Sequence, residues 1–234
     1  QYALTIRWED TDSKQVAVHP AKTISLSGGG SGKFFGSLQN DPANAAGVTS
    51  VALAADANDQ NIYYYNQKAE SNTISALIDS LTATTTITSN PGAYAKLQVL
   101  LPGVTAAAGT HTGETGTPTA VTAGTSSTVT VNAVDAYYNV VTSVTNSVAL
   151  TSSDTNAVLP AAAALASGTR SFSVTLKTAG AKNVTAADAT ASFSNKSSNV
   201  TVSAAAASKV AFESKTVTTF AGEASTAFTV VVND

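Results

Sequence analysis

An alternation of apolar and polar residues with a period of two recurs along the chain, and it constrains the fold more than any other feature. It is clear at Leu4–Trp8, at Val129–Ala133 and at Phe172–Leu176, where every second residue is apolar. Successive side chains of a β-strand point to opposite faces, so this pattern is typical of strands with one buried face. Thr and Val fill many other positions and favour strands. The alternation therefore predicts an all-β protein.

Turn-forming segments separate these strands at short intervals. They include residues 28–30 (GGG), 90–92 (NPG), 102–103 (PG) and 179–180 (AG). Short strands at such spacing predict antiparallel β-sandwiches. The alanine run 161–164 lies outside any apolar stripe with a period of 3.6 residues, so we expect no long helix there.

Internal repeats define the domain organisation. Residues 62–76 match residues 172–186 with a shift of 110, and residues 87–97 match residues 200–210 with a shift of 113. A third element, an alternating strand that ends in aspartate, occurs three times and closes at Asp10, Asp135 and Asp234.

The repeats predict three domains. Residues 1–92 form a sandwich that lacks its first strand, residues 93–205 form a complete one, and residues 206–234 form the first two strands of a third. Half a sandwich leaves unpaired strand edges. Two explanations remain open: the chain is part of a longer tandem array, or residues 206–234 complete the first domain of a neighbouring copy by strand exchange. The array is the simpler explanation.

Several segments together carry a resemblance to a known family. They are residues 95–103 (AKLQVLLPG), 116–118 (GTP), 128–135 (TVTVNAVD), 150–154 (LTSSD), 159–160 (LP) and 172–180 (FSVTLKTAG). This set resembles the tandem immunoglobulin-like repeats of very large bacterial surface proteins, and the first domain resembles a sister repeat. The resemblance implies tandem Ig-like antiparallel β-sandwich domains at an extracellular or bacterial cell-surface location. Residues 10–13 (DTDS) depart from the Gly-Asn turn usual there, so we expect a turn with its own geometry.

Composition excludes several classes of protein. The chain has no cysteine, which excludes a disulfide scaffold and a Cys-based zinc or redox site. Its net charge of −3 argues against nucleic-acid binding, which depends on many Lys and Arg. No apolar run approaches the roughly 20 residues that span a bilayer, so we expect no membrane span.

No catalytic constellation is visible in the sequence. His19 and His111 are the only histidines, and neither lies near a second histidine or a carboxylate cluster. Residues 28–32 (GGGSG) only loosely match the strand-to-helix elbow of a serine nucleophile. We therefore expect a protein that is not an enzyme and that has no organic cofactor.

The acidic cluster Glu9, Asp10 and Asp12 is the one candidate metal site. Calcium takes several oxygen ligands from carboxylates and carbonyls, and closely spaced acidic residues supply them. The alternative is an Asx turn, in which the aspartate at the strand end binds its own backbone. Asp135, at the end of the equivalent strand, has the same two possibilities.

Two further sets of residues suggest surface interactions. The pattern N-x-[ST] at Asn183, Asn195 and Asn199 makes these asparagines candidates for glycosylation. The tyrosines at 63, 65, 137 and 138 are candidates for a subunit or carbohydrate contact, because at least one residue of the run Tyr63–Tyr65 points away from its core. The alternative is one core tyrosine flanked by tyrosines that cover loops.

Three functions remain open. The first, which we expect, is a non-enzymatic structural subunit of a surface array or filament, such as an S-layer. Such a subunit associates with further copies of itself, and the low charge of the chain reduces repulsion between neighbours. The second is the stalk of an adhesin, a monomeric rod. The third is a carbohydrate-binding or spacer module of a secreted enzyme, whose binding would depend on exposed tyrosines.

Overall fold

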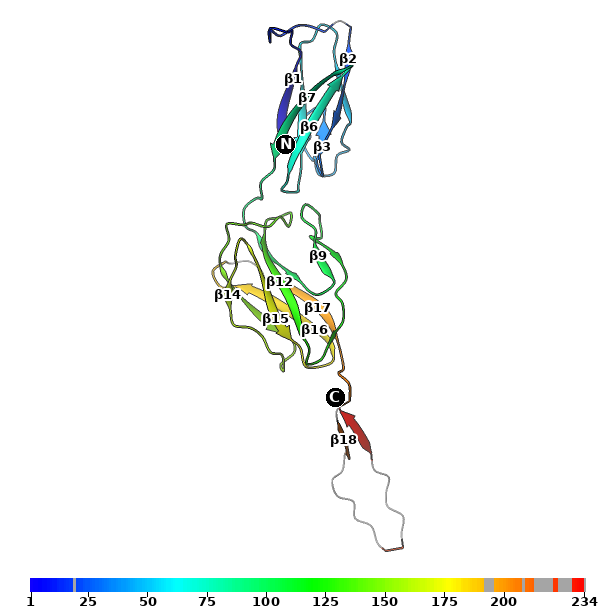
Figure 1. Cartoon of the computed structure of the whole chain (residues 1–234), viewed down its shortest axis with the longest axis vertical. Helices are drawn as coiled ribbons and strands as arrows, with labels where there is room; N and C mark the ends of the chain where they lie inside the picture. Colours follow the sequence, from blue (N-terminus) through cyan, green and yellow to red (C-terminus); the bar gives the residue numbers. More distant parts are fainter. Residues whose placement is uncertain (19, 192–195, 208, 213–220, 223–228, 234) are drawn as a thin grey trace.

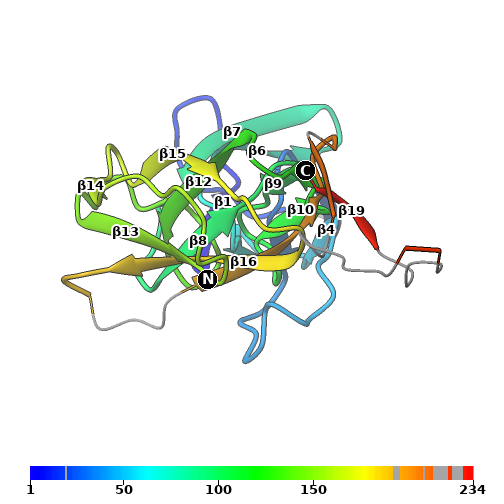
Figure 2. The ribbon, with the colours of Figure 1, turned by 90° about the horizontal axis from the view of Figure 1, so that it is seen from below.

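The computed structural model describes residues 1–18, 20–191, 196–207, 209–212, 221–222 and 229–233. The described residues form strands β1 to β19 and no helix. The predicted all-β class is therefore confirmed. The strands build two sandwiches that lie end to end along the long axis, and a two-stranded hairpin follows the second (Figure 1). Viewed along that axis, the two sandwiches overlap (Figure 2).

The first sandwich has two antiparallel sheets. One has the strand order β1-β5-β3, and the other has the order β4-β2-β6-β7. Their bounds are β1 Tyr2–Arg7, β2 Lys22–Ser27, β3 Lys33–Phe35, β4 Ser50–Leu53, β5 Asp59–Tyr65, β6 Ser71–Ile78 and β7 Leu81–Thr88.

The second sandwich has a three-stranded sheet, β15-β12-β8, and a five-stranded sheet, β11-β17-β16-β13-β14. β11 runs parallel to β17, and the other pairs are antiparallel. Because two such sheets face each other across one core with strands that cross between them, this is an immunoglobulin-like sandwich. The bounds are β8 Lys96–Leu100, β9 Val104–Ala106, β10 Glu114–Gly116, β11 Val121–Thr122, β12 Ser126–Val134, β13 Ser147–Ser152, β14 Ala163–Ala164, β15 Thr169–Thr175, β16 Gly180–Asp188 and β17 Lys196–Ser203.

Each sandwich has its own apolar core, built from the alternating positions. Val131 and Phe172 are buried in the second core, and Ile62, Ile74 and Tyr64 in the first. Residues matched by the repeat occupy equivalent places, since Ile62 corresponds to Phe172. Leu4, Ile6 and Trp8 pack against the first core, as their alternation predicts, but all three are only half-buried.

The third element is the hairpin of β18 (Lys209–Phe212) and β19 (Val230–Asn233). Lys209 pairs with Asn233 and Val210 with Val232. In the second sandwich, the matched residues Lys96 and Leu97 pair with Val134 and Ala133. The β18–β19 pair therefore has the register of the β8–β12 pair.

Candidate functional site

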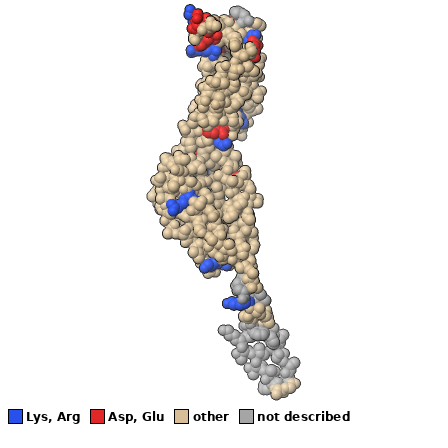
Figure 3. Space-filling model, viewed as in Figure 1, with Lys and Arg blue, Asp and Glu red and all other residues tan. Residues whose placement is uncertain are grey.

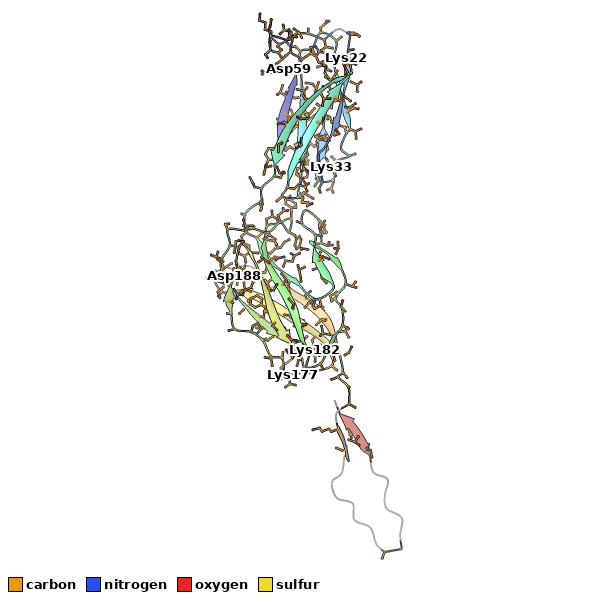
Figure 4. The ribbon with its side chains drawn as sticks, in the orientation of Figure 1. Lys22, Lys33, Asp59, Lys177, Lys182 and Asp188 are labelled. Atoms are coloured by element: carbon orange, nitrogen blue, oxygen red, sulfur yellow. The ribbon has the colours of Figure 1, made fainter. Side chains whose placement is uncertain are left out.

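The two sandwiches meet at a junction built from two turns. One turn follows β12, at residues 135–139, and the other joins β5 to β6, at residues 66–70. Charged side chains on the visible face gather at the upper end of the first sandwich, near this junction and around the lower end of the second sandwich, while the flanks carry few (Figure 3). Lys33 lies near the junction, and its ammonium donates to the carbonyl oxygens of Ala43 and Ala45 (Figure 4).

Asp135 organises the turn after β12. Its Oδ1 accepts the backbone N–H groups of Tyr137 at 2.8 Å and Asn139 at 2.9 Å. Its Oδ2 accepts the N–H of Gly92 at 2.8 Å and the side-chain amide of Asn139 at 2.9 Å. Burial raises the pKa of Asp135, but these hydrogen bonds outweigh it, so the pKa lies below its ordinary value. The carboxylate thus stays charged and fixes Asn139.

Asn139 connects the two sandwiches. Its Nδ2 donates to the carbonyl oxygen of Gln67 at 2.8 Å, and its Oδ1 accepts the N–H of Ala69 at 2.7 Å. The residue is only 3% exposed. Because both Nδ2 protons and the Oδ1 atom are engaged, the amide orientation is fixed and the junction has a defined geometry.

Glu70 holds the opposing turn in shape. Its Oε1 accepts the N–H of Ser31 at 2.8 Å and the side-chain amides of Asn66 and Asn72, and its Oε2 lies 2.9 Å from the Lys68 ammonium. The Ser31 bond, followed by the Lys68 contact, lowers the pKa of Glu70 to about 2. These contacts present the backbone groups of residues 67–69 to Asn139.

Three of the four candidate tyrosines, Tyr65, Tyr137 and Tyr138, lie at the junction. Tyr65 and Tyr137 come from opposite sides of the junction, and burial, followed by the neighbouring Tyr137 side chain, raises the pKa of Tyr65. Tyr138 lies beneath the Lys96 ammonium, 3.5 Å from its ring centroid. Tyr63 is half-buried on β5, and the core tyrosine of the run is Tyr64. Their contacts with subunits or glycans stay a prediction.

The acidic cluster lies at the end of the first sandwich that is far from the junction. Asp10 Oδ1 accepts the N–H groups of Asp12 at 2.9 Å and Lys14 at 3.0 Å, and Ser13 has a φ of 59°. Asp135 makes the same bonds at the same spacings, with Tyr138 at a φ of 64°. Residues 10–13 therefore have the same turn geometry as residues 135–138, and its difference from a Gly-Asn turn stays a prediction.

The remaining candidates are dispersed. Within the described ranges, no group of three or more His, Cys, Asp or Glu could hold a metal ion, and calcium binding at Glu9, Asp10 and Asp12 stays a prediction. Asn183 pairs with Asn199 across β16 and β17, while Asn195 and His19 lie outside the described residues. His111 is exposed between β9 and β10.

Asn139 and its partners were missed by sequence reasoning. Asp135 and the adjacent tyrosines were identified, but nothing local indicates that a side chain four residues later bonds to a backbone 70 residues away. A usable signal is an aspartate at a strand end followed at the fourth position by asparagine, because the Asx turn places that residue beyond the end of the sheet.

No protein-family model matches the chain, and a search of curated proteins finds no match. Among solved structures, the chain is similar to FdeC, an Escherichia coli adhesin, at 17% identity and a TM-score of 0.37, over 92% of this chain and 64% of that one. It is similar to domains 4 and 5 of the S-layer protein SbsC at 20% identity and a TM-score of 0.30, over 57% and 65% of the two chains. A β-glycosidase from Bacteroides vulgatus matches at 9% identity and a TM-score of 0.38, over 86% and 24%.

The chain thus spans about a quarter of that glycosidase and less than two thirds of the adhesin and S-layer structures. With TM-scores below 0.5, these likenesses do not assign the chain to a family. The immunoglobulin-like fold rests on the strand order described above. In the part of the chain that the structure describes, no helix is long and apolar enough to cross a membrane.

Proposed function

We propose that this chain is a section of a non-enzymatic extracellular array of immunoglobulin-like domains, such as an S-layer or filament at a bacterial surface, and that it associates with further copies of itself. The observation that carries the proposal is the connection between the sandwiches by Asn139. A buried two-way hydrogen bond between successive domains fixes their relative orientation, which a load-bearing array requires and independent enzyme or binding modules do not.

The surface of the molecule supports the same proposal. Only 12% of residues are charged, so the flanks of the rod bring little charge repulsion to neighbours. Thr and Ser side chains cover the exposed face of several strands and pair across them, as Ser71 does with Thr88 and Ser126 with Ser173. Such a surface suits contacts with identical copies or with glycans.

The test is the assembly state of the purified chain as its concentration rises. Sedimentation velocity and negative-stain electron microscopy should show filaments or sheets whose axial repeat matches two sandwiches. A monomeric rod at every concentration, with unchanged sedimentation, would contradict self-association and would favour the stalk of an adhesin.

A further inference from the structure

An open apolar groove runs along the first sandwich between the edges of its two sheets. Among the described residues, β1 pairs only with β5 and β7 only with β6. Between the free edges lie two adjoining hollows of about 270 and 200 Å³. The side chains that line them are mostly apolar, and they include Leu4, Ile6, Ile62, Ile74, Ala76 and Ala83.

In the second sandwich, the corresponding space is filled. β8 pairs with the edge of β12 that corresponds to the free edge of β1, and β11 pairs with the edge of β17. The β8 side chains Leu97 and Val99 are 2% and 0% exposed and belong to the core. Val200 on β17 is 4% exposed, whereas its repeat partner Ile87 on β7 is half-buried. The first sandwich therefore has a position equivalent to that of β8 in which no described strand lies, and the core side chains beneath this position line the open groove.

The backbone hydrogen bonds of β1 and β12 show that the two strand positions are equivalent. Trp8 donates its N–H to Asn58 and accepts that of Val16, both at 3.0 Å. Ala133, its match in the repeat, donates to Gly168 at 2.7 Å and accepts from Val141 at 2.9 Å. These bonds occupy the same edge in both sandwiches, so the opposite edge is the one that β8 covers and that β1 leaves open.

The hairpin β18–β19 supplies a strand of the required type. Lys209 and Val210 match Lys96 and Leu97 in the repeat, and β18 pairs with β19 in the register of β8 with β12. Val210 is 68% exposed, although Leu97 at the matching position is 2% exposed. A two-stranded hairpin alone is marginally stable in water, so β18 is free to exchange its partner.

We propose that β18 of one copy inserts into the groove of a second copy and pairs antiparallel with β1, in the place that β8 occupies in the second sandwich. This rests on the proposed self-association and names the contact that produces it. The repeat sets the register: Lys209 lies opposite Glu9, Val210 opposite Trp8 and Ala211 opposite Arg7. The exchange replaces the β18–β19 ladder with a β18–β1 ladder and buries Val210 against the core.

The geometry of the insertion produces a linear array. Residues 204–208 separate β17 from β18, and residues 89–95 separate β7 from β8, so the two links have similar lengths. The second sandwich of the donor copy therefore stacks on the first sandwich of the acceptor as the two stack within one chain. Such a heterologous contact does not close, so repeated insertions extend the array along one axis.

The charges at the two ends of the rod fit this stacking. The acceptor end carries Glu9, Asp10 and Asp12, with Lys14 beside them. The donor end carries Lys177 and Lys182, and the buried carboxylate of Asp154 accepts the backbone N–H of Lys177 there (Figure 4). Opposite charges at the meeting ends favour this encounter over the contact of two identical ends.

Disulfide trapping tests the contact directly, because the chain contains no cysteine. The double variant Arg7→Cys, Ala211→Cys places thiols opposite each other only between copies, since β1 and β18 lie in different parts of the rod (Figure 1). Mild oxidation should give a ladder of dimers, trimers and larger species on non-reducing gels. The control Thr86→Cys, Ala211→Cys, with Thr86 exposed on the outer face of β7, should give none.

Two substitutions separate this contact from assembly in general. Val210→Asp puts a charge on the inserted side chain, and Ala83→Arg fills the groove; each should raise the concentration needed for assembly about tenfold or more. The matched controls Thr128→Asp and Thr86→Arg, at exposed positions outside β18 and the groove, should leave it unchanged. If the Val210→Asp and Ala83→Arg variants assemble as the parent does, and the double-cysteine variant gives no ladder, the strand insertion is wrong but the proposed function stands. If the parent chain neither assembles nor yields a ladder in the cysteine variant, both proposals are wrong.

Discussion

The side-chain amide of Asn139 donates to the carbonyl oxygen of Gln67, 2.8 Å away across the junction, while its oxygen accepts the N–H of Ala69. One residue of the second sandwich thus satisfies two backbone groups of the first. The Asp135 carboxylate accepts the backbone N–H and the side-chain amide of Asn139, which fixes the orientation of that amide.

Replacing Asn139 by alanine should loosen the junction. The change leaves the Gln67 carbonyl and the Ala69 N–H without their partner, which costs about 1–3 kcal/mol. We expect small-angle scattering to show a broader distribution of lengths and proteolysis to cleave faster at residues 66–70. Asn199→Ala, on an exposed position of β17, is the matched control. An unchanged scattering profile in Asn139→Ala would mean that packing alone orients the sandwiches.

The Glu70 carboxylate should make the first sandwich sensitive to acid. Its pKa in the folded chain is about 2, below the ordinary value of 4.5, so the unfolded chain binds more protons at acidic pH. This stabilisation is complete above pH 4.5 and is lost as the pH falls toward 2. We expect Glu70→Gln to lower stability by about 1–2 kcal/mol at pH 7 and to flatten the decline between pH 4.5 and 2. Equal pH profiles for variant and parent would contradict this.

The two sandwiches should unfold at different denaturant concentrations. The groove leaves Leu81 62% exposed and Ile6 half-buried, whereas β8 closes the second core. Trp8 is the single tryptophan and lies in the first sandwich, so its fluorescence reports that unit alone. In dilute solution, the fluorescence transition should precede the main loss of β-structure in circular dichroism, and assembly should move it upward. Coincident transitions at low concentration would show that the two units unfold together.

Much of the fold is readable from the sequence, because period-two alternation reports directly on burial. Val131 and Phe172 were placed in a core by their neighbours alone, and the repeat related Ile62 to Phe172 correctly. Residues 102–124 contain β9, β10 and β11, which the sequence does not predict. The Gly, Thr and Ala residues of this segment carry no alternation, and its position is set by distant partners, such as the buried Gln98, whose amide donates to the carbonyl of Gly113. The junction escaped detection for the same reason, since Asn139 and Gln67 meet only after both sandwiches fold.

The turn at Asp10 offers a test that separates backbone capping from calcium binding. Asp10 uses Oδ1 to accept two backbone N–H groups, as Asp135 does in the second sandwich, so its role there does not depend on a metal. Asp10→Ala should lower the stability of the first sandwich by about 1 kcal/mol. We expect the same loss in excess EDTA and in millimolar Ca²⁺, with Trp8 fluorescence as the readout. Asp12→Ala, whose carboxylate would matter only as a ligand of a bound ion, is the matched variant. A loss that appears in both variants and only with Ca²⁺ present would show instead that Glu9, Asp10 and Asp12 hold the ion.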